Sequence, residues 1–426
     1  EITCRDWSSD VCSSDLKAWI KENPTETAVP EVLTIIADTY AHMGFYEEAQ
    51  YFFDRIFFEY ADSPYDEIAK IKLGDSFIRR ENGEKAYILY NQALFETKEL
   101  DVAALAAFRL AQMLIDKNIE EAGENIEKIA SANPKFLYEH LDDSMKLAEQ
   151  FVDREAYKSA ATIANTLSKF MQKPSVTYET MLYNNARWLD AAGEGKEAFD
   201  AYKKYLDEYP VGLFAEAAKQ GLDKLFIESA SKDNNAIEQI DKIIAGYQQG
   251  SSLHNEAMLK KAKILLSKEM YKEVIDMKSS LAGIEGAEAV IKEAALNIAQ
   301  ALAKEKDCKG LFSYIIDYSL ELPSEYDRGV SECGMSLGFE SQIKPIVERH
   351  LDDKNLNDRL FWLYNYLKIL YGEGKDRLFI AGSKDLITLS RDLKKEADYA
   401  DIYYLLLEDR KSKRLNSSHG KLYSMP

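Results

Sequence analysis

The histidines are one group of residues in this sequence that could form a metal site. His42, His140, His254 and His350 are spread over the chain, and none has a second histidine, a cysteine or a paired carboxylate at the spacing of a metal-binding motif. We therefore predict no metal site. We predict no cofactor either.

A glycine-rich stretch, "YGEGKDR", is a candidate for a phosphate-binding loop. It contains Gly372, Gly374 and Lys375, but it lacks the spacing and the Ser/Thr of a phosphate-binding loop, so a turn between two helices explains it better. No Gly-x-Ser-x-Gly motif of a hydrolase is present. The sequence therefore predicts a protein that is not an enzyme.

The cysteines are candidates for a metal site or for disulfide bonds. Cys4 and Cys12 lie in a terminal segment that is treated separately below, which leaves Cys308 and Cys333. These two fit neither a metal-binding spacing nor a dense disulfide framework. We expect two buried thiols in helices, and they do not settle the redox compartment.

Net charge restricts the class of partner. The chain carries a formal charge of −19 at pH 7, which argues against nucleic acid and anionic membrane surfaces, because both attract basic proteins. No apolar run reaches the roughly 18 residues that a membrane-spanning helix needs. We expect other proteins, as helical or extended segments, to be the partners, with no membrane span.

Both termini differ from the rest of the chain. The DNA string GACTGGAGTTCAGACGTGTGCTCTTCCGATC encodes "DWSSDVCSSD", residues 6–15, and its reverse complement encodes "DRKSTRLNSS", which matches residues 409–418 except at Lys413. The string resembles a short-read sequencing adapter. We interpret residues 1–16 and 409–426 as adapter-derived and exclude them from the fold. We also expect the remaining segment to be cut inside a longer protein at both ends.

Helical hairpins are expected to fill the remaining sequence. Apolar residues recur with helical spacing, and Gly, Pro or Asn-Asp pairs interrupt them every 15–20 residues or so. In "ARWLDAAGEGKEAFDAYKKYLDEYP", residues 186–210, Ala186 and Leu189 lie on one face of a first predicted helix. After a Gly-containing turn, Ala198, Tyr202 and Tyr205 share a face of a second helix. The packing positions of this stretch and of two upstream copies are Ala186, Ala198, Tyr202 and Pro210, then Gly74, Ala86 and Tyr90, then Ala49.

This pattern resembles the tetratricopeptide repeat, whose unit is about 34 residues long. Ala49 and Ala86 are 37 residues apart. The resemblance covers residues 17–323 as about seven or eight repeats, the first of them truncated, and residues 324–408 continue as divergent helical repeats. It implies an all-α fold, an α-solenoid that winds into a right-handed superhelix.

The style of the turns narrows the resemblance. "ADSPYDEIA" places an Asp-Ser-Pro turn before a new helix, and it is similar to the repeats of bacterial envelope proteins such as the outer-membrane assembly lipoprotein and the Tol-Pal coordinator. The long, acidic, Tyr-rich array also resembles paralysed flagellum protein A of flagellar motors. The resemblance implies a periplasmic or envelope-associated location, while a cytoplasmic one stays open.

The first helix of each repeat is expected to line a concave binding face. In each copy we single out the residue three before the small packing residue and the residue directly after it. The candidates for partner binding are Ile71, Asp75, Phe108, Gln112, Tyr183 and Arg187, with Asn184 beside them. They lack the Lys and Asn pairing of a clamp for chaperone tails, so a groove for a helical or extended partner segment is predicted.

Two functions fit this picture. The first is a non-catalytic scaffold or adaptor, part of a larger envelope protein. The alternative is the superhelical, non-catalytic region of a lytic transglycosylase whose catalytic domain is missing. The uninterrupted reading frame beyond residue 408 would distinguish them, because a transglycosylase would continue into a lysozyme-like domain with a catalytic Glu.

Trimming tests the interpretation of the termini. Removal of residues 1–16 and 409–426 is expected to leave helicity and melting temperature unchanged, because adapter-derived residues have no place in the core. Circular dichroism and thermal melts of the trimmed and full-length chains measure this. A large loss of stability would show that the termini contribute to the fold.

Overall fold

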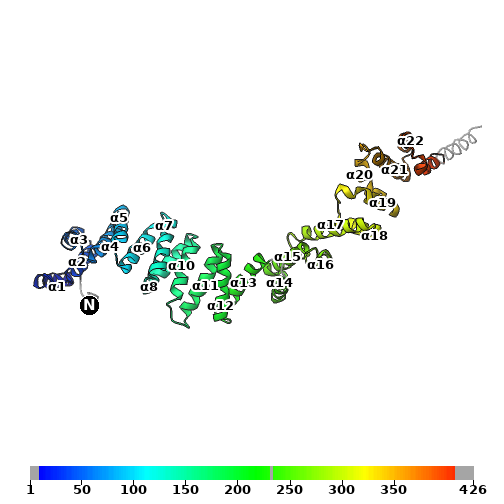
Figure 1. The fold of residues 1–426 in the computed structure, drawn as a ribbon. Coiled ribbons are helices and arrows are strands. Elements are labelled where there is room, and N and C mark those ends of the chain that lie inside the picture. Colours follow the sequence, from blue (N-terminus) through cyan, green and yellow to red (C-terminus); the bar gives the residue numbers. More distant parts are fainter. Residues whose placement is uncertain (1–8, 231–233, 408–426) are drawn as a thin grey trace, which may run out of the picture. The chain divides into compact units, whose positions relative to one another are not determined.

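A computed structural model describes residues 9–230 and 234–407. Helices occupy most of these residues, and no strand is found among them. The chain divides into two compact units, Glu1–Ser229 and Ala230–Pro426. Each unit is a train of helix hairpins (Figure 1), which confirms the predicted all-α solenoid.

The first unit pairs a first and a second helix in successive hairpins, which pack against one another. Its helices are α1 (Ser9–Glu22), α2 (Val29–Met43), α3 (Tyr46–Glu59), α4 (Tyr65–Arg79), α5 (Gly83–Glu96), α6 (Leu100–Leu114), α7 (Ile119–Ala132), α8 (Pro134–Glu139), α9 (Leu141–Asp153), α10 (Tyr157–Ser168), α11 (Val176–Ala191), α12 (Gly195–Glu208) and α13 (Ala215–Ser229). One hydrophobic core runs from Leu16 to Leu225.

The second unit continues with hairpins of less regular length. It contains α14 (Asn234–Gly246), α15 (Ser252–Ser267), α16 (Tyr271–Asp276), α17 (Ala287–Glu305), α18 (Cys308–Tyr318), η1 (Ser324–Tyr326), α19 (Asp327–Leu337), α20 (Glu340–Arg349), α21 (Leu356–Gly372), α22 (Asp376–Asp392) and η2 (Glu396–Tyr399). The division after Ser229 lies well before residue 323, where the sequence pattern changes. The stretch "YGEGKDR" spans the end of α21, the turn at residues 373–375 and the start of α22.

The N-terminal segment differs from the expectation. Helix α1 begins at Ser9, and Leu16 is buried with 5% of its surface exposed. Removal of residues 1–16 would therefore delete an apolar contact worth about 1.5–3 kcal/mol. The expectation of an unchanged melting temperature thus applies only to an N-terminal cut that ends before Leu16. Residues 1–8 and 409–426 lie outside the described chain.

Small side chains allow the two helices of a hairpin to approach each other closely. Ala49, Ala86, Ala186 and Ala198 are completely buried or nearly so, and Pro210 follows the end of α12. Tyr90 and Tyr202 are buried as well, which confirms that the aromatic positions form the core. At Gly74 the fit is tight, because an added Cβ would lie 2.6 Å from Cε1 of Tyr90.

A buried carboxylate closes the turn between α12 and α13. Glu179 of α11 is 7% exposed and accepts hydrogen bonds from the Tyr205 hydroxyl at 2.7 Å and from the Leu213 backbone N–H. The Tyr205 hydroxyl in turn accepts the backbone N–H of Phe214 at 2.9 Å. Three consecutive helices are thereby joined through one polar cluster in the apolar core.

Cys308 and Cys333 form a disulfide in the described structure, so the prediction of two free thiols is wrong. The bond joins the first residue of α18 to α19 across 25 residues of sequence. Helix packing brings the two side chains together, and sequence spacing alone does not reveal this.

Replacement of Gly74 by Ala tests the close helix contact. We expect a loss of about 1–3 kcal/mol, because the new methyl group would overlap the buried Tyr90 ring. Urea unfolding monitored by circular dichroism measures it. Gly195→Ala is the matched control, since its Cβ would meet Leu225 Cδ2 only at 3.7 Å. Equal stability of both variants would contradict the packing argument.

Reduction of the disulfide tests its role in the second unit. A bond that closes a loop of this length stabilises a fold by about 3 kcal/mol. We therefore expect Cys308→Ser/Cys333→Ser, or the reduced parent, to melt at a lower temperature than the oxidised parent. Calorimetry with and without reductant measures this shift. The double variant should no longer respond to reductant, and an unchanged parent would contradict the prediction.

Alkaline pH tests the buried tyrosine cluster. Burial, followed by the hydrogen bond to Glu179, raises the pKa of Tyr205 from 10.0 to about 12. Between these values the unfolded chain releases a proton that the folded chain keeps, so stability falls as pH rises, by about 1.4 kcal/mol per pH unit for one tyrosine.

Tyr205→Phe should therefore have a smaller loss of stability between pH 10 and 12 than the parent chain. Urea unfolding at several pH values measures these slopes. Tyr51→Phe serves as the control, because Tyr51 is 60% exposed. A slope for Tyr205→Phe that equals the parent's would contradict the assignment.

Candidate functional site

The predicted site residues lie on the first helices α4, α6 and α11. In the structure, some of them are buried between helices and others are polar side chains that contact neighbouring repeats or line a groove. Ile71 and Phe108 are 0% and 1% exposed, so they cannot contact a partner, and their assignment to a binding surface is wrong. The Phe108 ring meets Phe136 edge to face at 5.9 Å between ring centroids. Phe108 therefore packs against α8.

Tyr183 occupies the same repeat position on α11 and packs in the same direction. Its ring stacks on Phe214 with 4.5 Å between centroids and 3° between planes. The tyrosine is partly buried against the core. It therefore links its hairpin to the next one and offers only part of its surface to a ligand.

The residues directly after the small packing residues form a polar ladder across α2, α4 and α6. Asp38 on α2 lies 2.9 Å from Nζ of Lys72 on α4. Asp75 on α4 lies 3.1 Å from Nε of Arg109 on α6. Arg109 also donates to the side-chain oxygen of Gln112 at 2.9 Å. Each carboxylate is thus paired with a cation from the following first helix.

A core tyrosine also contributes to this ladder. The Tyr90 hydroxyl donates to Asp75 Oδ1 at 2.7 Å, and burial together with the Asp75 carboxylate raises the pKa of Tyr90 well above its ordinary value. Asp75 therefore connects the core of one hairpin to the surface of the next. This arrangement stabilises the stacking of repeats, and the Asp75 and Gln112 side chains are already engaged within the chain.

A groove of about 300 Å³ opens between the next first helices, α9 and α11. Asn184 and Arg187 both line it, so the structure brings these two predicted residues together. Its remaining lining residues are Met145, Ala148, Glu149, Val152, Asp153, Met181 and Trp188. The groove therefore combines an apolar floor with acidic residues on α9 and a cation on α11.

Sequence reasoning missed the α9 side of this groove. A weaker repeat copy places Ala148 at the small packing position, and the same rule that identified Arg187 would have selected Met145 and Glu149. Trp188 had no such signal, since it lies one residue further along α11. Only the packed structure shows that it lines the groove.

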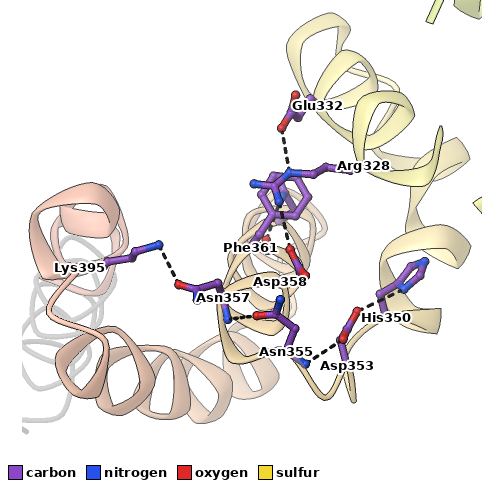
Figure 2. A network of polar contacts seen from close by, with 10 residues as sticks. Arg328, Glu332, His350, Asp353, Asn355, Asn357, Asp358, Phe361 and Lys395 are labelled. Atoms are coloured by element: carbon purple, nitrogen blue, oxygen red, sulfur yellow. Dashed lines mark hydrogen bonds and ion pairs between the residues drawn. The ribbon is translucent and has the colours of Figure 1, made fainter. Parts of the chain in front are cut away.

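A second polar network joins hairpins of the second unit (Figure 2). Arg328 of α19 donates to Asp358 of α21 at 3.1 Å and lies 4.4 Å from the centre of the Phe361 ring. Lys395, after α22, donates to Asn357 Oδ1 at 2.8 Å. The Arg328 contacts cross from one hairpin to the next, and the Lys395 contact joins α21 to the segment after α22. We interpret both as structural.

Neither a metal site nor a membrane span is found among the described residues. Within 9–230 and 234–407, no group of three or more His, Cys, Asp or Glu side chains is arranged to hold a metal ion. None of the helices in those ranges is long and apolar enough to cross a bilayer.

Comparisons with known proteins give structural similarity only. No family model matches the chain, and no curated protein matches it. Among solved structures, it is similar to a tetratricopeptide repeat protein from Parabacteroides merdae, at 14% identity and a TM-score of 0.26, over 67% of this chain and 98% of the other.

Two further solved structures are similar over more of the chain. Naa15/Naa10 bound to HypK matches at 13% identity and a TM-score of 0.24, over 96% of this chain and 77% of the other. A human IFIT1 dimer with m7Gppp-AAAA matches at 15% identity and the same TM-score, over 90% and 86%. Because the TM-scores are this low, the similarity to these structures does not show what this chain binds. The helix hairpins of the chain itself establish the helical-repeat fold.

Proposed function

We propose that this chain is a non-catalytic protein-interaction scaffold that binds partner segments along its first helices. The groove between α9 and α11 is the observation that carries the proposal. Along α2, α4 and α6 the equivalent positions are closed by ion pairs. Between α9 and α11 they line an open groove with both apolar and charged groups, which suits a protein segment.

The binding residues in this proposal are Asn184 and Arg187, with Tyr183 beside Arg187. Asp75 and Gln112 belong to the same face of the first helices but are engaged in the ladder. The strong negative charge of the chain favours a protein partner with basic groups over nucleic acid.

The proposed setting is the bacterial envelope, where the chain would be part of a larger periplasmic or flagellar-motor-associated protein. Two observations support it. The Asp-Ser-Pro turn at residues 62–64 resembles those of envelope repeat proteins. The Cys308–Cys333 bond suits an oxidising compartment such as the periplasm.

Affinity capture tests the scaffold function. The full chain, immobilised and exposed to bacterial envelope extract, is expected to retain a stoichiometric protein partner that mass spectrometry identifies. Asn184→Ala/Arg187→Ala should lose this partner, because both side chains line the groove. Lys196→Ala/Lys203→Ala on α12 is the control, since neither residue lines it. Failure to retain a partner, or equal retention by the groove variant, would contradict the proposal.

A further inference from the structure

We propose that the groove between α9 and α11 binds an extended peptide segment in which an apolar residue is followed by a basic one. This inference rests on the proposed scaffold function and defines the class of segment that the scaffold accepts. Three features of the groove support it: its floor, an unpaired indole N–H, and the placement of its charges.

The floor of the groove accepts one apolar side chain. Met145 and Val152 of α9 and Met181 of α11 line it, together with Ala148. Ala148 and Met181 are 1% and 4% exposed, so they form a firm base. Methionine side chains are flexible and adapt to irregular apolar shapes. A volume of about 300 Å³ leaves room for a side chain the size of leucine or methionine and part of the adjoining main chain.

Trp188 supplies a hydrogen-bond donor without an acceptor. The residue is 5% exposed and lines the groove, and its Nε1 is buried with no hydrogen-bond partner among the described residues. A buried donor without an acceptor destabilises the fold, because its hydrogen bond to water is lost and not replaced. A ligand carbonyl that displaces the side chains covering this N–H and accepts its hydrogen bond therefore gains affinity.

A peptide main chain is the ligand that fits this donor. Its carbonyl can accept from the indole N–H. The side-chain amide of Asn184, which lines the same groove, carries both a donor and an acceptor and so matches the N–H and C=O of a peptide unit. A segment that exposes its main chain to these groups must be extended, because a helix satisfies its own carbonyls.

The charged side chains of the groove indicate which type of ligand residue lies beside the apolar one. Glu149 and Asp153 lie four residues apart on α9, on one face of the helix, and both are exposed and line the groove. A lysine or arginine of the ligand can meet both carboxylates. Arg187 lies on the opposite side, 5.9 Å from the rings of Tyr183 and Trp188. A ligand carbonyl is expected on that side and the ligand cation at α9.

Three short peptides with blocked ends and Gly/Ser flanks test the inference. Their central pairs are Leu-Lys, Leu-Glu and Ser-Lys, so each control changes one feature. We expect the full chain to bind the Leu-Lys peptide at least about tenfold more tightly than either control, which is the effect of losing one favourable contact. Isothermal calorimetry measures the affinities.

Variants of the chain identify the groups responsible. Glu149→Gln/Asp153→Asn should remove the preference for Leu-Lys over Leu-Glu. Glu124→Gln/Glu127→Gln on α7 removes the same charge from exposed positions outside the groove and should keep the preference. Trp188→Phe should weaken Leu-Lys binding about tenfold, with the circular dichroism spectrum showing that the fold is retained.

Equal affinity for Leu-Lys and Leu-Glu, or no binding of either, would overturn the inference. Hydrogen exchange with peptides selected from a random library separates this failure from failure of the scaffold function. Protection on α2, α4 or α6 but not on α9 and α11 would overturn only the groove assignment. If selection yields no peptide that protects any first helix, the proposed function fails as well.

Discussion

Close packing of small side chains against aromatic ones is the contact on which the rest of the structure depends. A hairpin has two apolar faces and cannot cover both alone, so it needs a neighbour on each side. Gly74 shows how little space is left, because the Tyr90 ring fills the position that a Cβ would take. Repetition of this fit along the first unit makes one core from Leu16 to Leu225.

The same packing decides what polar groups on the first helices do. Where first helices lie near each other, carboxylates such as Asp38 and Asp75 meet cations from the next repeat, since a half-buried charge is costly without a partner. Between α9 and α11 a groove separates the helices, and Arg187 lies beside aromatic rings instead. One repeat position thus stabilises the solenoid in one place and lines an open groove in another.

The second unit achieves stability by different means. Its described core is divided into separate clusters, around Phe312, Val274 and Phe379, and its hairpins follow the repeat pattern less closely. A covalent bond between Cys308 and Cys333 and cation contacts such as Arg328 with Asp358 and Phe361 join neighbouring hairpins. Directional contacts of this kind compensate for a less regular apolar pattern.

By itself, the sequence determined the helical hairpins and the packing positions. Spacing along one chain dictates helix faces, so periodicity alone assigns Ala86, Tyr90, Ala198 and Tyr202 to the core, where all four are buried. Contacts between repeats were decided only by tertiary packing. Register places Ile71 on the same face of α4 as Asp75, and Phe108 on the same face of α6 as Gln112. Yet Ile71 and Phe108 are both buried. The disulfide and the unpaired indole of Trp188 likewise depend on distances between helices, which no periodicity within one helix can specify.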